Sequence, residues 1–170
     1  MKRIALILLL AGCAPDHPSA RYLTVGQVVD PVNFASLAGT WNEVAFFPSG
    51  LTDGCVGTTA TFSAPDAEGG MTVVQTCQRD GRTVQFPATG KIRGPGMLRI
   101  VGVNELLSGD LLILGQADGG RTVFLGTQSR VTGTVLHKDR NISPQTMDTA
   151  SEVFRNAGYD VAALQRTVQR

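Results

Sequence analysis

The chain has 170 residues, of which 42% are hydrophobic and 17% are charged, and its formal net charge is +1. This length suits a single domain, and the near-neutral charge excludes a basic field that recruits nucleic acid and an acidic tail that holds cations. The HExxH, GxSxG and phosphate-binding glycine motifs are absent, so the sequence predicts neither an enzyme nor a bound cofactor or metal.

The N-terminal residues have the pattern of a bacterial lipoprotein signal. A basic start precedes the apolar run 4–10, and the small residues Ala11 and Gly12 stand directly before Cys13. The apolar run is too short to span a bilayer as a helix, so we expect residues 1–12 to be removed and Cys13 to carry the lipid. An ordinary secretory signal with an incidental cysteine is the alternative.

Residues 13–30 are expected to be a lipidated N-terminus and linker, rich in Pro, Ala and Ser, ahead of a domain at 31–170. The residue after the lipidated cysteine is Ala14. In lipoproteins of Gram-negative bacteria an Asp at this position commonly signals retention at the inner membrane. We therefore expect an outer-membrane protein that faces the periplasm and contacts the membrane through its acyl chains.

Two cysteines remain once Cys13 is lipidated, and their surroundings predict a disulfide between Cys55 and Cys77. The segments 56–63 and 71–76 read as a hairpin that folds back near residue 66, which places the two cysteines opposite each other. An exported protein also lies in an oxidising compartment. A reactive thiol pair or a metal site is the alternative, but it lacks CxxC spacing and a nearby histidine.

From Trp41 onward, short runs of alternating apolar residues are separated by glycine-rich turns. Eight sequential antiparallel strands in one domain most simply close into an all-β up-and-down barrel, which leaves no exposed edge. The predicted strands are 41–47, 56–63, 71–76, 84–92, 97–103, 111–116, 121–126 and 131–137.

The last quarter of the chain predicts one helix followed by an extended segment at 159–168. Ser143 is a suitable N-cap, Pro144 suits the first helical position, and Gly158 is a suitable stop. Apolar residues recur at helical spacing, so one face should pack outside the barrel. These residues are Met147, Ala150, Phe154 and Ala157.

Residues 37–48 contain Gly39-Thr40-Trp41 followed by a predicted strand, and they resemble the first motif of the lipocalins, especially the bacterial outer-membrane lipocalins. The resemblance covers nearly all of the mature chain, with its elements in the same order. It implies a calycin-type eight-stranded antiparallel barrel with one C-terminal α-helix packed outside. It continues through Cys55 and the segments 58–63, 126–130 and 157–160.

One position departs from the family pattern. Lipocalins usually have an arginine that stacks over the motif tryptophan, and an alignment without gaps puts Lys138 there, where it can make a cation–π contact with Trp41. A shift of two residues would put Arg140 at this position instead. His137, which ends the preceding strand, has no neighbouring ligands in the sequence and is a poor metal ligand.

The resemblance implies that the face of Trp41 looks into the barrel, and Glu43, Ala45 and Phe47 share that face by strand alternation. A buried carboxylate is costly unless it is paired, so we favour a network of Glu43 with Lys138 or Arg99 over a ligand amine or headgroup. Other inward residues either line a ligand cavity or simply pack as core. The candidates are Phe62, Phe86, Leu98, Ile100, Leu112, Leu114 and Phe124.

We therefore expect a lipid-anchored protein that binds a small hydrophobic or amphiphilic molecule, such as a fatty acid or a lysophospholipid, with the headgroup at the open mouth. The alternative is an envelope-maintenance or protein-interaction module, for example an inhibitor-like barrel, with a filled interior. The sequence does not indicate an oligomeric state.

Overall fold

The structure, a computed structural model, describes residues 33–50, 52–102 and 108–169. The expected signal 1–12, the linker 13–30 with the lipidation site Cys13, and Val103 at the end of one predicted strand lie outside these residues. In the described part of the chain, no helix combines the length and the apolar character needed to cross a membrane.

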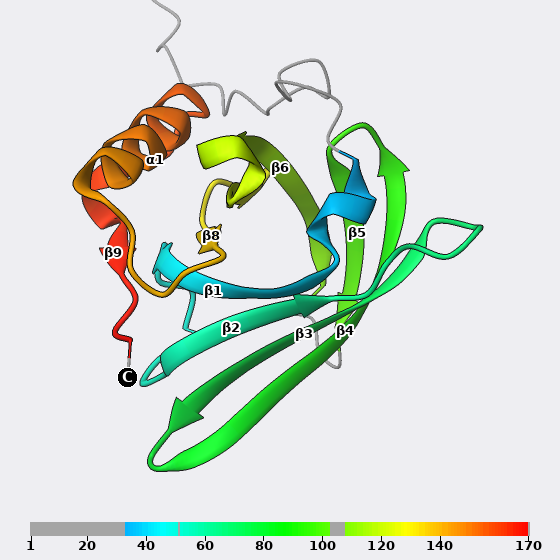
Figure 1. The fold of residues 1–170 in the computed structure, drawn as a ribbon, viewed down its shortest axis with the longest axis horizontal. Coiled ribbons are helices and arrows are strands. Elements are labelled where there is room, and N and C mark those ends of the chain that lie inside the picture. The colour runs from blue at the N-terminus through cyan, green and yellow to red at the C-terminus, as the bar shows by residue number, and fades with distance from the viewer. Residues whose placement is uncertain (1–32, 51, 103–107, 170) are drawn as a thin grey trace, which may run out of the picture.

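Eight antiparallel strands close into an up-and-down barrel, which confirms the predicted fold class. Each strand pairs with the next in the chain, and the first also pairs with the eighth, so the ring is complete (Figure 1). The strands are β1 (Gly39–Phe46), β2 (Val56–Phe62), β3 (Gly70–Arg79), β4 (Arg82–Gly94), β5 (Met97–Gly102), β6 (Gly109–Ala117), β7 (Thr122–Thr127) and β8 (Gly133–His137).

One end of the barrel is closed by the 3₁₀ turn η2 (Phe34–Leu37). Asn33 caps this turn by accepting a hydrogen bond from the Ala35 amide, and the turn buries Phe34 and Leu37. Trp41 is completely buried beneath it and donates its indole N–H to the Leu37 carbonyl at 2.7 Å. The polar atom of the largest core side chain is thereby satisfied, as burial requires.

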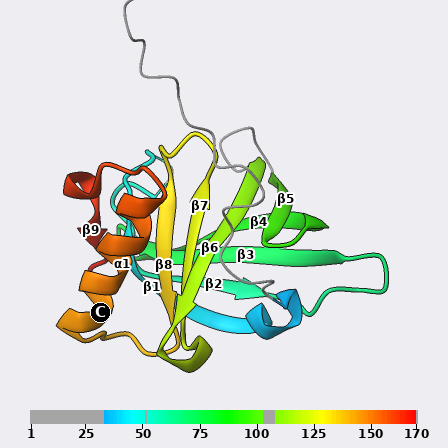
Figure 2. The same ribbon diagram turned by 90° about the horizontal axis from the view of Figure 1, so that it is seen from above.

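The predicted helix forms as α1 (Pro144–Asn156) and lies outside the barrel (Figure 2). The Ser143 hydroxyl accepts the Thr146 amide, as expected for an N-cap, and Gly158 follows the helix end with a φ of +85°. Ala150 and Phe154 are fully buried against the barrel wall.

The segment after the helix is less extended than predicted. It contains the 3₁₀ turn η5 (Val161–Ala163) and the short strand β9 (Gln165–Arg166), which pairs with β1. Beyond β9, the Thr167 amide donates to the Val44 carbonyl and the Gly57 amide donates to the Val168 carbonyl. The C-terminal segment therefore lies between β1 and β2 at the end where these two strands no longer pair with each other.

Candidate functional site

The barrel contains a cavity of about 240 Å³ toward the end formed by the loops after β1 and β7. Polar residues of these loops, including Ser49, Thr52 and Thr132, stand at its rim. Its wall is mainly apolar, so it suits an apolar ligand. The apolar side chains are Phe46, Phe47, Ala60, Phe62, Val73, Phe86, Ala88, Ile100, Leu111, Leu125 and Leu136.

The structure brings together most of the residues that the sequence proposed for ligand contact. Five of the seven line the cavity, namely Glu43, Phe47, Phe62, Phe86 and Ile100. Leu112 and Phe124 do not, because both pack on the outer side of the barrel with α1. Their assignment to the interior was wrong.

The reason for this error lies in the composition of β6 and β7. Leu111 and Leu125 line the cavity, whereas their chain neighbours Leu112 and Phe124 pack in the cluster that includes Phe154 of α1. A strand covered on both faces is apolar on both faces and has no period of two. The alternation rule therefore gives no means of choosing between the faces of these strands.

A bulge in β1 corrects a second expectation. The pairing of β1 with β8 shifts register between Glu43 and Ala45, so Val44 and Ala45 both join the cluster beneath α1. Phe46 then lines the cavity, which strict alternation would have placed outside. Phe47 lies at the junction, since it lines the cavity and also contacts the ring of Phe154 with centroids 4.9 Å apart.

Glu43 is the most unusual group on the cavity wall. Its residue is only 4% exposed, and its carboxylate accepts hydrogen bonds from the Gln75 amide at 3.2 Å and from the hydroxyls of Thr134 at 3.1 Å and Thr167 at 3.3 Å. These donors come from β3, β8 and the C-terminal segment, so three separate parts of the chain position the carboxylate.

The expected ion pair of Glu43 with Lys138 or Arg99 is absent. The Lys138 ammonium lies over Trp41, and the Arg99 guanidinium pairs with Asp110 at 3.2 Å. No ion pair joins Glu43 to any lysine, arginine or histidine in the described residues. The buried carboxylate is held by uncharged donors alone.

Burial without a cation raises the pKa of Glu43 from 4.5 to about 7, because the cavity wall replaces water around the charge. The hydrogen bonds from Thr134, Thr167 and Gln75 oppose this shift, since they stabilise the ionised form. A carboxyl group inside an apolar cavity with a pKa near neutrality changes its charge with small changes in its surroundings.

The predicted disulfide is confirmed between Cys55 and Cys77, with their Cα atoms 5.5 Å apart. It ties the residue just before β2 to β3. Arg79, two residues further along β3, contacts the Cys55 sulfur at 3.5 Å and lies over the Phe86 ring at 5.7 Å from the centroid. The Arg79 guanidinium therefore lies next to Phe86, a residue of the cavity wall, and the carboxyl groups on the described part of that wall are those of Glu43 and Asp110.

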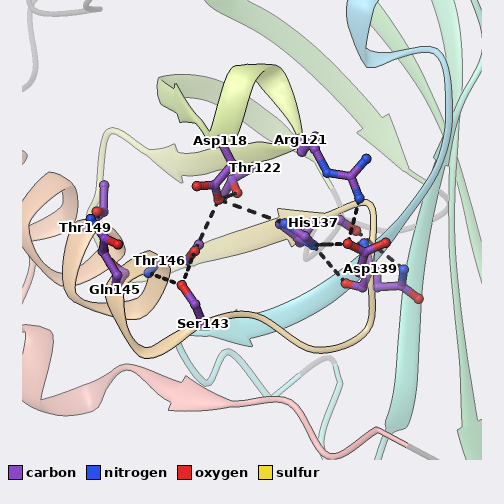
Figure 3. A network of polar contacts seen from close by, with 10 residues as sticks. Asp118, Arg121, Thr122, His137, Asp139, Ser143, Gln145, Thr146 and Thr149 are labelled. Atoms are coloured by element: carbon purple, nitrogen blue, oxygen red, sulfur yellow. Dashed lines mark hydrogen bonds and ion pairs between the residues drawn. The ribbon is translucent and has the colours of Figure 1, made fainter.

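A second polar cluster lies outside the cavity, where α1 begins (Figure 3). Asp118 accepts hydrogen bonds from the hydroxyls of Thr122 and Thr146, and His137 Nε2 lies 3.9 Å from its carboxylate. His137 Nδ1 accepts the Asp139 amide at 2.8 Å. Across the described part of the chain no group of three or more potential metal ligands forms, and this cluster connects α1 to the barrel.

The comparisons with known proteins agree with this architecture. The family model of the lipocalin-like domain matches residues 32–169. No curated protein sequence matches the chain. Lobster apocrustacyanin A1 is similar in structure, with 19% identity, a TM-score of 0.66, and coverage of 81% of this chain and 80% of that one.

Two further solved structures are similar at low sequence identity. The cockroach allergen Per a 4 has 12% identity and a TM-score of 0.67, with 86% of this chain and 94% of that one covered. Insecticyanin from the tobacco hornworm Manduca sexta has 13% identity and a TM-score of 0.64, with 83% and 82% covered. These likenesses show the fold, and the family match over most of the chain shows that this protein belongs to the lipocalin family.

Proposed function

We propose that this lipocalin binds one slender apolar or amphiphilic molecule, such as a fatty acid or a lysophospholipid, in its barrel. The observation that carries the proposal is the apolar cavity of about 240 Å³. Pockets for drug-sized ligands usually measure roughly 300–1,000 Å³, so this cavity suits a single hydrocarbon chain better than a large ring system. Lipocalins are generally non-enzymatic binders, and we assign no reaction to this one.

Burial of the ligand's hydrocarbon chain supplies the binding affinity. Each methylene removed from water stabilises the complex by about 0.8 kcal/mol, before the costs of association are subtracted. Polar rim residues such as Ser49, Thr52 and Ser108 suit a headgroup that stays near water. The open cavity favours this function over the alternative of a protein-interaction module with a filled interior.

Adjacent residues of β4 offer a matched pair of variants for the test. Ala88 lines the cavity, whereas Thr89 is exposed on the outer face of the barrel. In the mature chain carrying Cys13→Ser, we expect Ala88→Trp to weaken binding of an environment-sensitive apolar fluorophore, because the indole occupies the ligand volume. Thr89→Trp should bind as the parent does. Equal binding by both variants, with both folded, would reject a ligand site in the barrel.

We also propose that the protein is anchored to the periplasmic face of the outer membrane through acyl chains on Cys13. Support comes from the small residues Ala11 and Gly12 before this cysteine and from Ala14 after it. Cys13→Ser expressed with its signal should lose lipid labelling and leave the membrane fraction or stay unprocessed. Normal processing and normal fractionation of this variant would exclude the anchor without affecting the proposed ligand site.

A further inference from the structure

The cavity holds one carboxyl group whose partners are all uncharged. Glu43 accepts hydrogen bonds from Gln75, Thr134 and Thr167, and it has no ion pair within the described residues. We propose that Glu43 is the recognition site for a protonated amine carried on an apolar body. This inference rests on the proposed binding function and, among amphiphilic ligands, selects a cationic one over the anionic fatty acid given there as an example.

The hydrogen-bonding capacity of the carboxylate leaves room for such a ligand. An ionised carboxylate offers about four acceptor positions, and an ammonium group is a donor only. The side chains of Gln75, Thr134 and Thr167 occupy three of these positions, while the buried Thr58 hydroxyl lies close enough to lower the pKa of Glu43 but has no hydrogen-bond partner. Beside a buried carboxylate, the attraction between an ammonium and the carboxylate is stronger than in bulk solvent, because fewer water molecules screen the two charges. A carboxylate or phosphate headgroup at the same depth would instead meet a like charge.

Among the residues that the structure describes, the other charged groups near the cavity contact partners of their own, which leaves Glu43 as the anionic site. Asp110 is the only other ionisable residue on the described wall, and Arg99 neutralises it. Arg79 contacts the ring of Phe86 and the sulfur of Cys55. The parts of β2, β3, β8 and the C-terminal segment that face the Glu43 carboxylate contribute an amide and hydroxyls, with no titratable group among them.

The carboxylate is also held in place, which favours recognition over a passive core role. Thr167 binds one oxygen, while Gln75 and Thr134 bind the other. The Gln169 side chain donates to the backbone carbonyl of Glu43 at 2.6 Å, so the C-terminal segment fixes the residue from a second direction. A ligand amine therefore meets a pre-organised acceptor and incurs little ordering cost.

Ligand binding should be linked to proton release. Burial raises the pKa of Glu43 to about 7, and a bound ammonium lowers it again by favouring the ionised form. An alkylamine has a pKa near that of lysine, about 10.4, and stays protonated throughout the range from pH 5.5 to pH 8. Amine affinity should therefore rise over this range, and binding near pH 6 should release close to one proton.

The test compares decylamine, decanol and decanoate, which share one chain length and differ in charge. At pH 8, decylamine should displace an apolar fluorophore from the mature Cys13→Ser chain at a concentration about tenfold lower than either of the others. Glu43→Gln should remove this preference and still bind decanol. Glu68→Gln, a control at an exposed carboxyl group that does not line the cavity, should keep it.

Calorimetry at pH 6 in two buffers of different ionisation enthalpy then measures the released proton. The inference is overturned if decanol or decanoate binds the unsubstituted protein as tightly as decylamine does. This comparison uses no variant, so it does not depend on how well a variant folds. An amine preference that survives Glu43→Gln in folded protein also overturns it. Displacement by none of the three probes rejects the proposed binding function itself.

Discussion

The ammonium group of Lys138 lies 3.5 Å from the centre of the Trp41 ring and covers the closed end of the barrel. The gapless alignment with the family predicted this position for Lys138, and the contact confirms it. Lysine supplies the positive charge over the ring but not the planar stacking that an arginine would add. The two residues join the end of β8 to the start of β1, where the barrel closes.

Lys138→Met should lower the free energy of unfolding by about 0.5–1 kcal/mol, because it keeps much of the aliphatic stem and removes the cation–π attraction. Lys138→Arg should preserve stability. Trp41 is the one tryptophan in the chain, so its fluorescence during urea unfolding measures the change. A Lys138→Met variant as stable as the unsubstituted protein would mean that the positive charge over Trp41 contributes nothing to the free energy of unfolding.

The double variant Cys55→Ser, Cys77→Ser should remain folded, because the barrel has its own core. Closing a loop between residues 22 apart stabilises the folded state by about 3 kcal/mol in the loop-entropy model, and this contribution should be lost. Thermal unfolding of the oxidised protein, the reduced protein and the variant checks the value. Reduction should have no further effect on the variant, and equal stability of all three would contradict the prediction.

The stability of the protein should fall between pH 5 and pH 8 because of Glu43. Its pKa rises from 4.5 in the unfolded chain to about 7 on folding, so the folded state binds the proton more tightly. This contribution is complete below pH 4.5 and is lost as the pH rises through 7, with a total near 3 kcal/mol.

Urea unfolding at a series of pH values tests this sign. Glu43→Gln keeps the size of the side chain and removes the titration, so its stability should be nearly independent of pH in this window. It should exceed the unsubstituted protein in stability at pH 8. A parent protein whose stability rises from pH 5 to pH 8 would show that burial of the charge is compensated by another group.

Tyr159→Phe should destabilise the fold by about 1–3 kcal/mol. The Tyr159 hydroxyl accepts the Thr127 amide at 2.7 Å and is 3.0 Å from the Thr132 carbonyl, so it joins the two sides of the β7–β8 turn. The phenylalanine ring retains the contact with Phe47 but leaves the Thr127 amide without the tyrosine oxygen, while the Thr132 carbonyl keeps the hydrogen bond from the Thr127 hydroxyl.

Hydrogen exchange of the Thr127 amide should therefore accelerate more than that of strands far from the turn. Gly126→Ala provides an independent check, because its added Cβ would overlap the same hydroxyl. Gly126→Ala should lower the stability of the unsubstituted protein more than it lowers the stability of the Tyr159→Phe variant. Equal effects in both backgrounds would exclude the tyrosine hydroxyl as the cause.

Local patterns along the chain were sufficient to predict the architecture. The turn at Asp80-Gly81 and the apolar alternation around it identified the β3–β4 hairpin, because a hairpin depends on a turn and on its two flanking strands. Ser143 and Gly158 marked the ends of α1 for the same reason, since caps act within one helical turn. The hairpin predicted between Cys55 and Cys77 places the two cysteines opposite each other, and it therefore predicted their disulfide.

The tertiary structure alone decided which faces look inward and what Glu43 contacts. Leu111 and Leu112 are alike in sequence, and only the docking of α1 on one side of the barrel assigns one to the cavity and the other to the helix interface. The Thr167 hydroxyl reaches Glu43 from 124 residues away, where the C-terminal segment lies between β1 and β2. Such contacts arise when barrel closure brings distant segments together, so they are determined by the complete fold and not by any local pattern of residues.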